Sequence, residues 1–341
     1  MTESNLNRNY SLDHLRVLAT ILVICVHSSG GYVLSVLDGQ KIDSNFYVGN
    51  WVDSFSRVCV PIFVMLSGYF LLDNQQKPIE FYKKRFSKIL IPLIFWSVLY
   101  TIYSGLKFYY LNRSIDFNLL LDSWIKGKPY FHLWYMYMLL GLYAVSPWIN
   151  LVLKNLDNQK LGLLGFGLLF ISSIYVTFYG YSKENVFFAF WFIPYLGYFV
   201  VGCFFSRINR KLNSILLLLL YLVCSVTIFA LTNVSIENKH STPFYSYLNP
   251  LVVVSSLSLF LFFSLGRLSR NHFSELSVYT FGVYFVHAGI LDVIGKMMFF
   301  TKIQFLDNAL LGLPIKVFVT FVLSFLVVKF FRQNSLLRRF V

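Results

Sequence analysis

The sequence predicts an all-α integral membrane protein, a polytopic helical bundle with about ten transmembrane helices. Of its 341 residues, 57% are hydrophobic and 13% are charged, whereas soluble domains carry about 25% charged residues. The mean hydropathy is +0.64. Apolar windows of about 20 residues, the length that crosses hydrocarbon about 30 Å thick, recur along nearly the whole chain. We therefore expect one membrane-embedded domain over residues 1–341, without a fused soluble domain.

Turn and cap residues place the ends of the expected helices. The first span should remain as a membrane anchor, because no small-residue cleavage site follows it. The stretch SGYFLLDNQQKP ends the second span, VSPWIN ends the fourth, and LNP begins the eighth. The longest expected connections are 37–53, 107–130 and 233–246. The expected spans are 12–36, 54–72, 86–106, 131–152, 160–179, 186–205, 214–232, 247–266, 277–299 and 308–331.

Lysine and arginine residues indicate the orientation of the bundle. With a cytoplasmic N-terminus, about two thirds of the 29 Lys and Arg residues fall at cytoplasmic helix ends. With an even number of helices, this positive-inside bias places both termini in the cytoplasm. Topology also accounts for the net charge of +14, so we expect no nucleic-acid partner. The four cysteines lie inside apolar spans without metal-ligand spacing, and we expect no metal site.

Ionisable side chains inside the spans are the first candidates for a functional site. Such a group costs a few kcal/mol on insertion scales, and it usually faces the bundle interior or a water-filled cavity. His27 should lie about 22 Å from the cytoplasmic end of its helix, and Arg57 should reach a similar depth from the outer end of the second span. His287 is expected near the midplane, and Lys316 lies comparably deep in the tenth span. These groups are expected to face one cavity.

Basic residues near the cytoplasmic surface form a second candidate group. Asp13 and Arg16 are three residues apart and can pair on one helix face. Lys84, Arg85 and Lys88 lie together in KPIEFYKKRFSKILIP, where the third span begins. Two interpretations are open for this basic segment. In the first, the segment is a topology signal that binds lipid head groups. In the second, it binds a polyphosphorylated cytoplasmic ligand.

The histidines in the expected spans can also have purely structural roles. A transmembrane histidine such as His27 or His287 can serve only to hydrogen-bond between helices. His132 stands beside Trp134 and Tyr135 at the start of the fourth span. For His132 we expect packing at the membrane interface, where aromatic residues are common.

Five segments, in this order along the chain, resemble the acyltransferase-3 family of membrane O-acyltransferases in its short form. They are LDHLRVLATILVICVH, VPIFVMLSGYFLL, KKRFSKILIP, HLWYMYMLLGLYAVSPWI and SVYTFGVYFVHAGIL. Within that family, the sequence is similar to the enterobacterial common antigen O-acetyltransferases and the exopolysaccharide succinyltransferases. The resemblance implies acyl transfer from cytoplasmic acyl-CoA, usually acetyl-CoA, to a hydroxyl of a glycan or lipid-linked saccharide. It also implies a multi-pass protein of a bacterial cell membrane.

The resemblance also implies roles for individual residues. Family members need the arginine and histidine of the first span, here Arg16 and His27. An Arg-x-x-Arg pair is associated with CoA, and this sequence has Lys88 after Arg85. Lysine neutralises a phosphate as a point charge but lacks bidentate geometry. The ninth-span Y-x-x-H motif corresponds to Tyr284 and His287. The resulting candidates are catalytic His27, Arg16, Asp13 and His287, CoA-binding Arg16, Lys84, Arg85 and Lys88, and acceptor or oxyanion groups Arg57, Tyr284 and Lys316.

The chemistry and three other functions remain open at this level. His27 is expected as the general base for the acceptor hydroxyl, because imidazole titrates near neutral pH; a transient acyl-histidine is the alternative. A transporter or flippase for a lipid-linked sugar or exopolysaccharide would also have ten helices and buried charges. The remaining alternatives are the other large family of membrane O-acyltransferases and an inactive relative that acts as an assembly partner.

Overall fold

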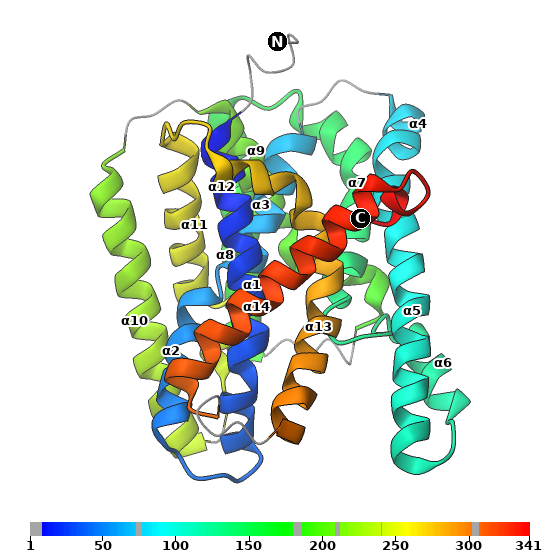
Figure 1. Cartoon of the computed structure of the whole chain (residues 1–341). Helices are drawn as coiled ribbons and strands as arrows, with labels where there is room; N and C mark the ends of the chain where they lie inside the picture. The colour runs from blue at the N-terminus through cyan, green and yellow to red at the C-terminus, as the bar shows by residue number, and fades with distance from the viewer. Residues whose placement is uncertain (1–8, 73–76, 180–185, 209–211, 240, 302–306) are drawn as a thin grey trace.

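A computed structural model describes residues 9–72, 77–179, 186–208, 212–239, 241–301 and 307–341, and these residues form helices and turns without any strand (Figure 1). Within these described ranges, ten helical runs are long and apolar enough to cross a membrane. This confirms the all-α fold and the number of spans. The α-helices are α1 (Tyr10–Leu37), α2 (Ser44–Ser56), α3 (Cys59–Leu71), α4 (Pro78–Phe81), α5 (Ser87–Asn112), α6 (Phe117–Ile125), α7 (Trp134–Leu153), α8 (Asn158–Tyr179), α9 (Leu196–Arg207), α10 (Ser214–Lys239), α11 (Pro250–Leu265), α12 (His272–Glu275), α13 (Thr280–Thr301) and α14 (Ala309–Gln333).

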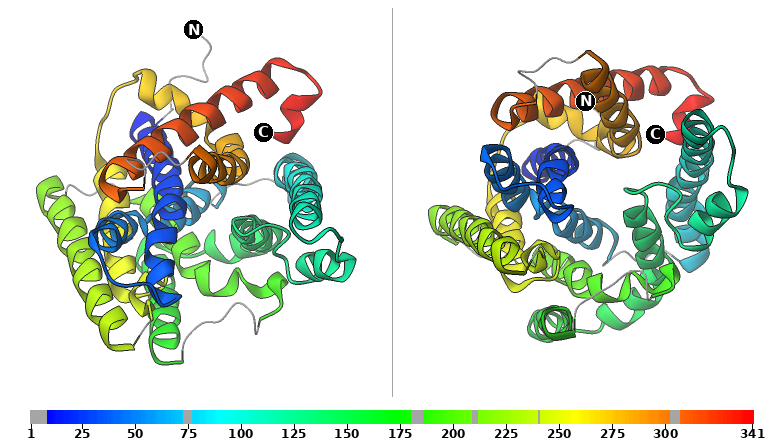
Figure 2. Two further views of the ribbon diagram at one scale, coloured as in Figure 1. Left: turned by 60° about the horizontal axis from the view of Figure 1, so that its bottom comes forward. Right: turned by 90° about the horizontal axis from the view of Figure 1, so that it is seen from below.

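Helix α1 lies in the interior of the bundle and carries the first candidate residues. The side chain of Asn9 caps its start by accepting a hydrogen bond from the backbone N–H of Leu12 at 3.2 Å. It packs against α2, α3, α13 and α14, and the views along the bundle show it enclosed by these helices (Figure 2). We call the end of the bundle where α1 begins the proximal end, and the end where α1 finishes the distal end.

The second span differs from its expected extent. It runs over Ser44–Leu71 as α2 and α3, instead of starting at residue 54. Asp43 begins the helix early, because its side chain accepts the backbone N–H of Phe46 at 2.9 Å. Arg57 and Val58 form the turn between α2 and α3. Arg57 therefore lies in the middle of this span, not a few residues from its outer end.

The other long connections also contain helix. Residues 107–130 include the end of α5 and all of α6, whose Trp124 donates from Nε1 to the Thr101 hydroxyl at 2.8 Å. Helix α10 continues to Lys239, well past its expected end at residue 232. Residues 73–76, which belong to the turn expected after the second span, lie outside the described residues.

Two glycines allow α3 and α9 to pack backbone against backbone. A Cβ on Gly68 would lie 1.8 Å from the carbonyl oxygen of Phe199, and a Cβ on Gly202 would lie 2.1 Å from that of Met65. Small residues permit such close helix contacts inside membranes, where packing rather than hydrophobic burial drives association. This contact fixes α3, which lines the candidate site.

The chain ends against α5. Helix α14 crosses the bundle obliquely (Figures 1 and 2), and the short 3-10 helix Leu337–Phe340 follows it. Trp96 donates from Nε1 to the carbonyl of Phe340 at 2.8 Å, and the rings of Phe95 and Phe340 stack with centroids 4.1 Å apart. The C-terminal segment thereby ties α14 to the proximal half of α5.

Candidate functional site

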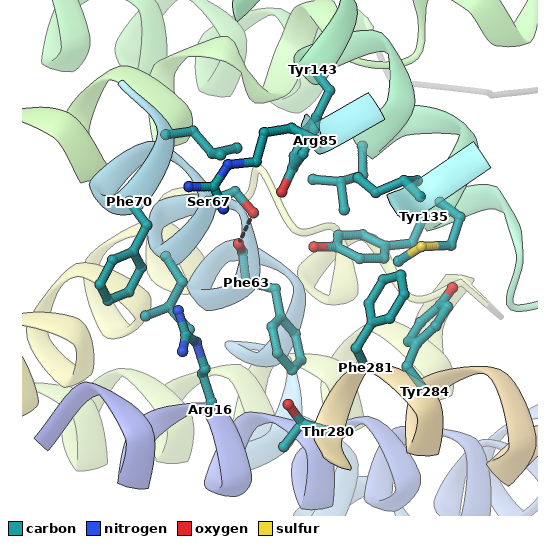
Figure 3. A pocket seen from close by; sticks show the side chains of 15 residues that line it. Arg16, Phe63, Ser67, Phe70, Arg85, Tyr135, Tyr143, Thr280, Phe281 and Tyr284 are labelled. Carbon is teal, nitrogen blue, oxygen red and sulfur yellow. Dashed lines mark hydrogen bonds between the residues drawn. The ribbon is translucent and has the colours of Figure 1, made fainter. Parts of the chain in front are cut away.

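A cavity of about 220 Å³ lies in the proximal half of the bundle, between α1, α3, α5, α7 and α13 (Figure 3). We call it the proximal cavity. Its lining combines two arginines with tyrosine hydroxyls and apolar side chains, so it offers positive charge at one part and an apolar wall at another. The residues are Arg16, Phe63, Leu66, Ser67, Phe70, Leu71, Arg85, Ile89, Tyr135, Met136, Leu139, Tyr143, Thr280, Phe281 and Tyr284.

Arg16 reaches the proximal cavity from the second turn of α1. Its Nη1 lies 3.3 Å from Oδ1 of buried Asp13, and its guanidinium carbon lies 4.4 Å from the ring centroid of Phe70. The carboxylate and the aromatic face together hold the guanidinium in place. Asp13 therefore supports Arg16 and does not itself line the cavity.

Arg85 reaches the same cavity from a π-helical turn, Tyr82–Phe86, that joins α4 to α5. Single π-turns often occur at functional positions, because the extra residue per turn redirects side chains. The buried Nε of Arg85 has no hydrogen-bond partner among the described residues. Lys84 and Lys88, on either side, are exposed and do not line the cavity. The structure thus brings Arg85 to Arg16 and leaves the two lysines on the surface.

Three histidines from distant parts of the chain meet beyond this cavity. The rings of His27 and His287 stack with centroids 5.4 Å apart, and His132 lies edge-on to His287 at 5.2 Å. Nδ1 of His287 donates to the carbonyl of Val283 at 3.2 Å, which leaves Nε2 free of any partner among the described residues. Because a neutral imidazole carries one proton, that Nε2 has a free lone pair.

The expected interfacial position of His132 is wrong. Its side chain is 1% exposed, and both ring nitrogens are buried inside the bundle. Residues 131–133 form a turn before α7 that directs the ring inward, and the Tyr284 hydroxyl donates to the carbonyl of His132. The adjacent Trp134 and Tyr135 suggested a membrane interface; only the presence of two other buried histidines pointed to this cluster.

The histidines are separated from the proximal cavity by a shared aromatic wall. A small cavity of about 20 Å³ is lined by His27 and His132, and three residues line both cavities: Phe63, Tyr135 and Tyr284. Along α1, the eleven residues from Arg16 to His27 span about 16 Å. One helix therefore carries a cationic group at one cavity and an imidazole at the next.

Arg57 is held in a buried ion pair and lines neither cavity. Its Nε lies 2.7 Å from Oδ1 of Asp53, and its Nη2 donates to Oδ2 at 2.7 Å. The guanidinium carbon also lies 4.1 Å from the ring centroid of Tyr245. Sequence reasoning missed Asp53, because the segment 37–53 was expected to be a loop.

Lys316 is also directed elsewhere. Its Nζ donates to the hydroxyl of Tyr32 at 3.1 Å, and Tyr32 lies five residues beyond His27 toward the distal end of α1. The expected single cavity for His27, Arg57, His287 and Lys316 is therefore not what the structure shows: only the two histidines come together. In the described ranges, no group of three or more His, Cys, Asp or Glu side chains has metal-binding geometry.

Comparison with known proteins gives one family and one curated relative. The model of the acyltransferase-3 family, described as an acyltransferase domain, matches residues 9–329. An amino-acid racemase from Enterococcus faecalis is 23% identical over 357 residues, covering 96% of this chain and 47% of the racemase. The chain thus spans about half the length of this curated relative. No solved structure matches.

Proposed function

The chain belongs to the acyltransferase-3 family of membrane acyltransferases, and from this premise we propose that it transfers an acetyl group from acyl-CoA to a hydroxyl of a cell-surface glycan or glycolipid. The observation that carries this proposal is the alignment of two cavities along α1. Arg16 and Arg85 offer positive charge at the first cavity, and His27 and His132 offer imidazoles at the second. A long donor with an anionic head and a thin acyl arm matches that arrangement.

Acyl-CoA would bind with its phosphates at the two arginines. Guanidinium groups suit phosphate oxygens because they present several N–H donors in a fixed plane. The acyl-pantetheine arm would follow the apolar wall of the proximal cavity toward Tyr135 and Tyr284. Those two residues also line the small cavity that contains His27 and His132. A small shift of their aromatic rings would therefore bring the thioester to the imidazoles.

His27 would act as the general base. The acceptor oxygen attacks the thioester carbonyl carbon while its proton passes to the imidazole of His27. The resulting oxyanion collapses and breaks the C–S bond, and the imidazolium returns the proton to the departing thiolate of CoA. His132 would stabilise the oxyanion by donating a hydrogen bond, since its buried ring lines the same small cavity as His27. An acyl-imidazole on His27 is the alternative chemistry.

The test is acyl transfer from radiolabelled acetyl-CoA in membranes that contain the protein and its glycan. Labelled glycan with the parent chain, and none with His27→Ala at equal protein amount, would support the proposal. Membranes in which the parent chain moves or flips saccharide without any label on the glycan would instead support a transporter. If the protein itself carries the radiolabelled acetyl group when no acceptor is present, the reaction passes through the acyl-imidazole.

A further inference from the structure

A third cavity, of about 790 Å³, lies in the distal half of the bundle between α5 and α13. Figure 2, seen from below, shows these two helices well apart at this end. Each helix lines the cavity with one stripe at helical spacing, beginning at Tyr103 on α5 and at Ala288 on α13. We call it the distal cavity. Its lining is mostly apolar, with a compact group of charged side chains from both helices.

The charged group carries a net positive charge. Nζ of Lys107 lies 3.4 Å from Oδ1 of Asp292, and Nζ of Lys296 lies 3.2 Å from Oδ2. Tyr103 donates to Oδ2 of Asp292 and accepts from Nζ of Lys296 at 2.9 Å. Two ammonium groups thus share one carboxylate, and both are 42% exposed. A cavity with apolar walls and excess positive charge attracts anions.

The distal cavity ends one aromatic ring away from the histidines. Phe131 lines it and packs edge-on against His27, with ring centroids 5.0 Å apart. On α13, Asp292 lies five residues beyond His287, about 7.5 Å along the helix axis. A group held at the two lysines would therefore lie about one sugar ring from the imidazoles, on the side opposite to the proximal cavity.

We propose that the distal cavity is the acceptor site, and that Lys107 and Lys296 select acceptors carrying a phosphate or carboxylate beside the hydroxyl to be acylated. This inference rests on the proposed function. Lysine ammonium groups bind either anion as point charges, without a fixed geometry. Phe131 stands between the distal cavity and His27, so its ring must turn aside for the hydroxyl to reach the imidazole.

The test measures binding without requiring turnover. A cysteine at Gly295, which lines the distal cavity, would have no atom within 4 Å of its Cβ. Gly31→Cys is the matched control, because Gly31 is exposed, also has open space, and lies outside the cavity. Labelling of each thiol by a membrane-impermeant maleimide is followed with glucose 1-phosphate, glucuronate or glucose added. The parent chain reports any labelling of its native cysteines.

We expect glucose 1-phosphate or glucuronate to slow labelling of Gly295→Cys several-fold, and glucose and the Gly31→Cys control to show no effect. Adding Lys107→Gln and Lys296→Gln should abolish the protection, while Lys296→Arg should retain it and report a folded protein. Protection by phosphatidylglycerol vesicles, but not by the soluble anions, would identify a lipid headgroup as the source of the anion. Equal protection by glucose, or protection that survives both Lys→Gln changes, would overturn the proposal.

The two proposals can fail separately. If anions protect the thiol but the protein transfers no acyl group, the proposed anion site is supported and the proposed acyltransferase mechanism is contradicted. If Lys296→Gln still transfers the acyl group and its KM for an acidic acceptor is unchanged, the mechanism is supported and the proposed anion site is contradicted. If both hold, Lys296→Gln raises the KM for the acceptor several-fold and leaves the KM for acyl-CoA unchanged.

Discussion

The imidazole of His27 stacks on that of His287, with ring centroids 5.4 Å apart, although 260 residues separate them in the chain. His287 donates from Nδ1 to the carbonyl of Val283 on its own helix, which fixes the plane against which His27 rests. Both side chains sit between a cavity that contains two arginines and a cavity that contains two lysines. Under the proposed function, this position accounts for a histidine so deep in an apolar helix.

Arg85 and its neighbours allow the donor site to be tested with an internal control. Arg85→Ala should raise the KM for acyl-CoA about tenfold or more, because a charged hydrogen-bonding group is worth about 1.5–3 kcal/mol. Lys84→Ala should change it much less, since Lys84 is exposed and lies outside the cavity. Initial rates at varied acetyl-CoA would measure both. Equal effects of the two substitutions would argue against CoA binding in the proximal cavity.

Asp13 should act on the donor through Arg16. Asp13→Asn removes the carboxylate that lies 3.3 Å from Nη1 of Arg16, so the guanidinium loses a constraint without losing its charge. We expect a higher KM for acyl-CoA with a smaller change in kcat. A loss of kcat at unchanged KM would instead place Asp13 in the chemical step.

The ion pair of Asp53 and Arg57 should be a stability element. Asp53→Asn leaves a buried guanidinium without its counter-charge, and breaking such pairs costs about 3–5 kcal/mol. The protein should therefore lose thermal stability in detergent. The measurement is the temperature at which heating removes the monodisperse peak from size-exclusion chromatography. The double variant Asp53→Leu with Arg57→Met should recover part of this loss, because no charge stays buried. A fully stable, inactive Asp53→Asn protein would point to a catalytic role.

Close packing of α3 on α9 gives a second stability prediction. Gly68→Ala would put a Cβ 1.8 Å from the carbonyl oxygen of Phe199, so the two backbones must separate. Overpacking of this kind costs about 1–3 kcal/mol, and α3 would also shift at the proximal cavity. Gly167→Ala, where a Cβ meets nothing within 4 Å, is the matched control. The same thermal assay should show a lower stability for Gly68→Ala alone.

Hydropathy was enough to predict the ten spans, because each helix must satisfy its own backbone hydrogen bonds in lipid. The same reasoning found His27 and His287, since ionisable groups are rare inside such spans. It missed Asp53, because the polar segment before residue 54 hid a helix cap at Asp43. It placed His132 at an interface, because a turn before α7 cannot be read from aromatic content.

The direction of individual side chains was the other feature that the sequence could not predict. Arg57 and Lys316 lie within spans as expected, but their partners Asp53 and Tyr32 direct them away from the histidines. Arg85 was separated from Lys84 and Lys88 only by the π-helical turn Tyr82–Phe86, which has no simple sequence signal. The sequence indicated which span carries each of these groups, whereas the helix face that each group occupies depended on tertiary contacts.

The most direct measurement of the central claim compares His27→Ala with the parent chain in membranes supplied with radiolabelled acetyl-CoA. We expect the parent chain to label the glycan and His27→Ala to give no label above membranes without the protein. Equal insertion and equal thermal stability of the two proteins would show that the fold is intact. Full labelling by His27→Ala would contradict the account.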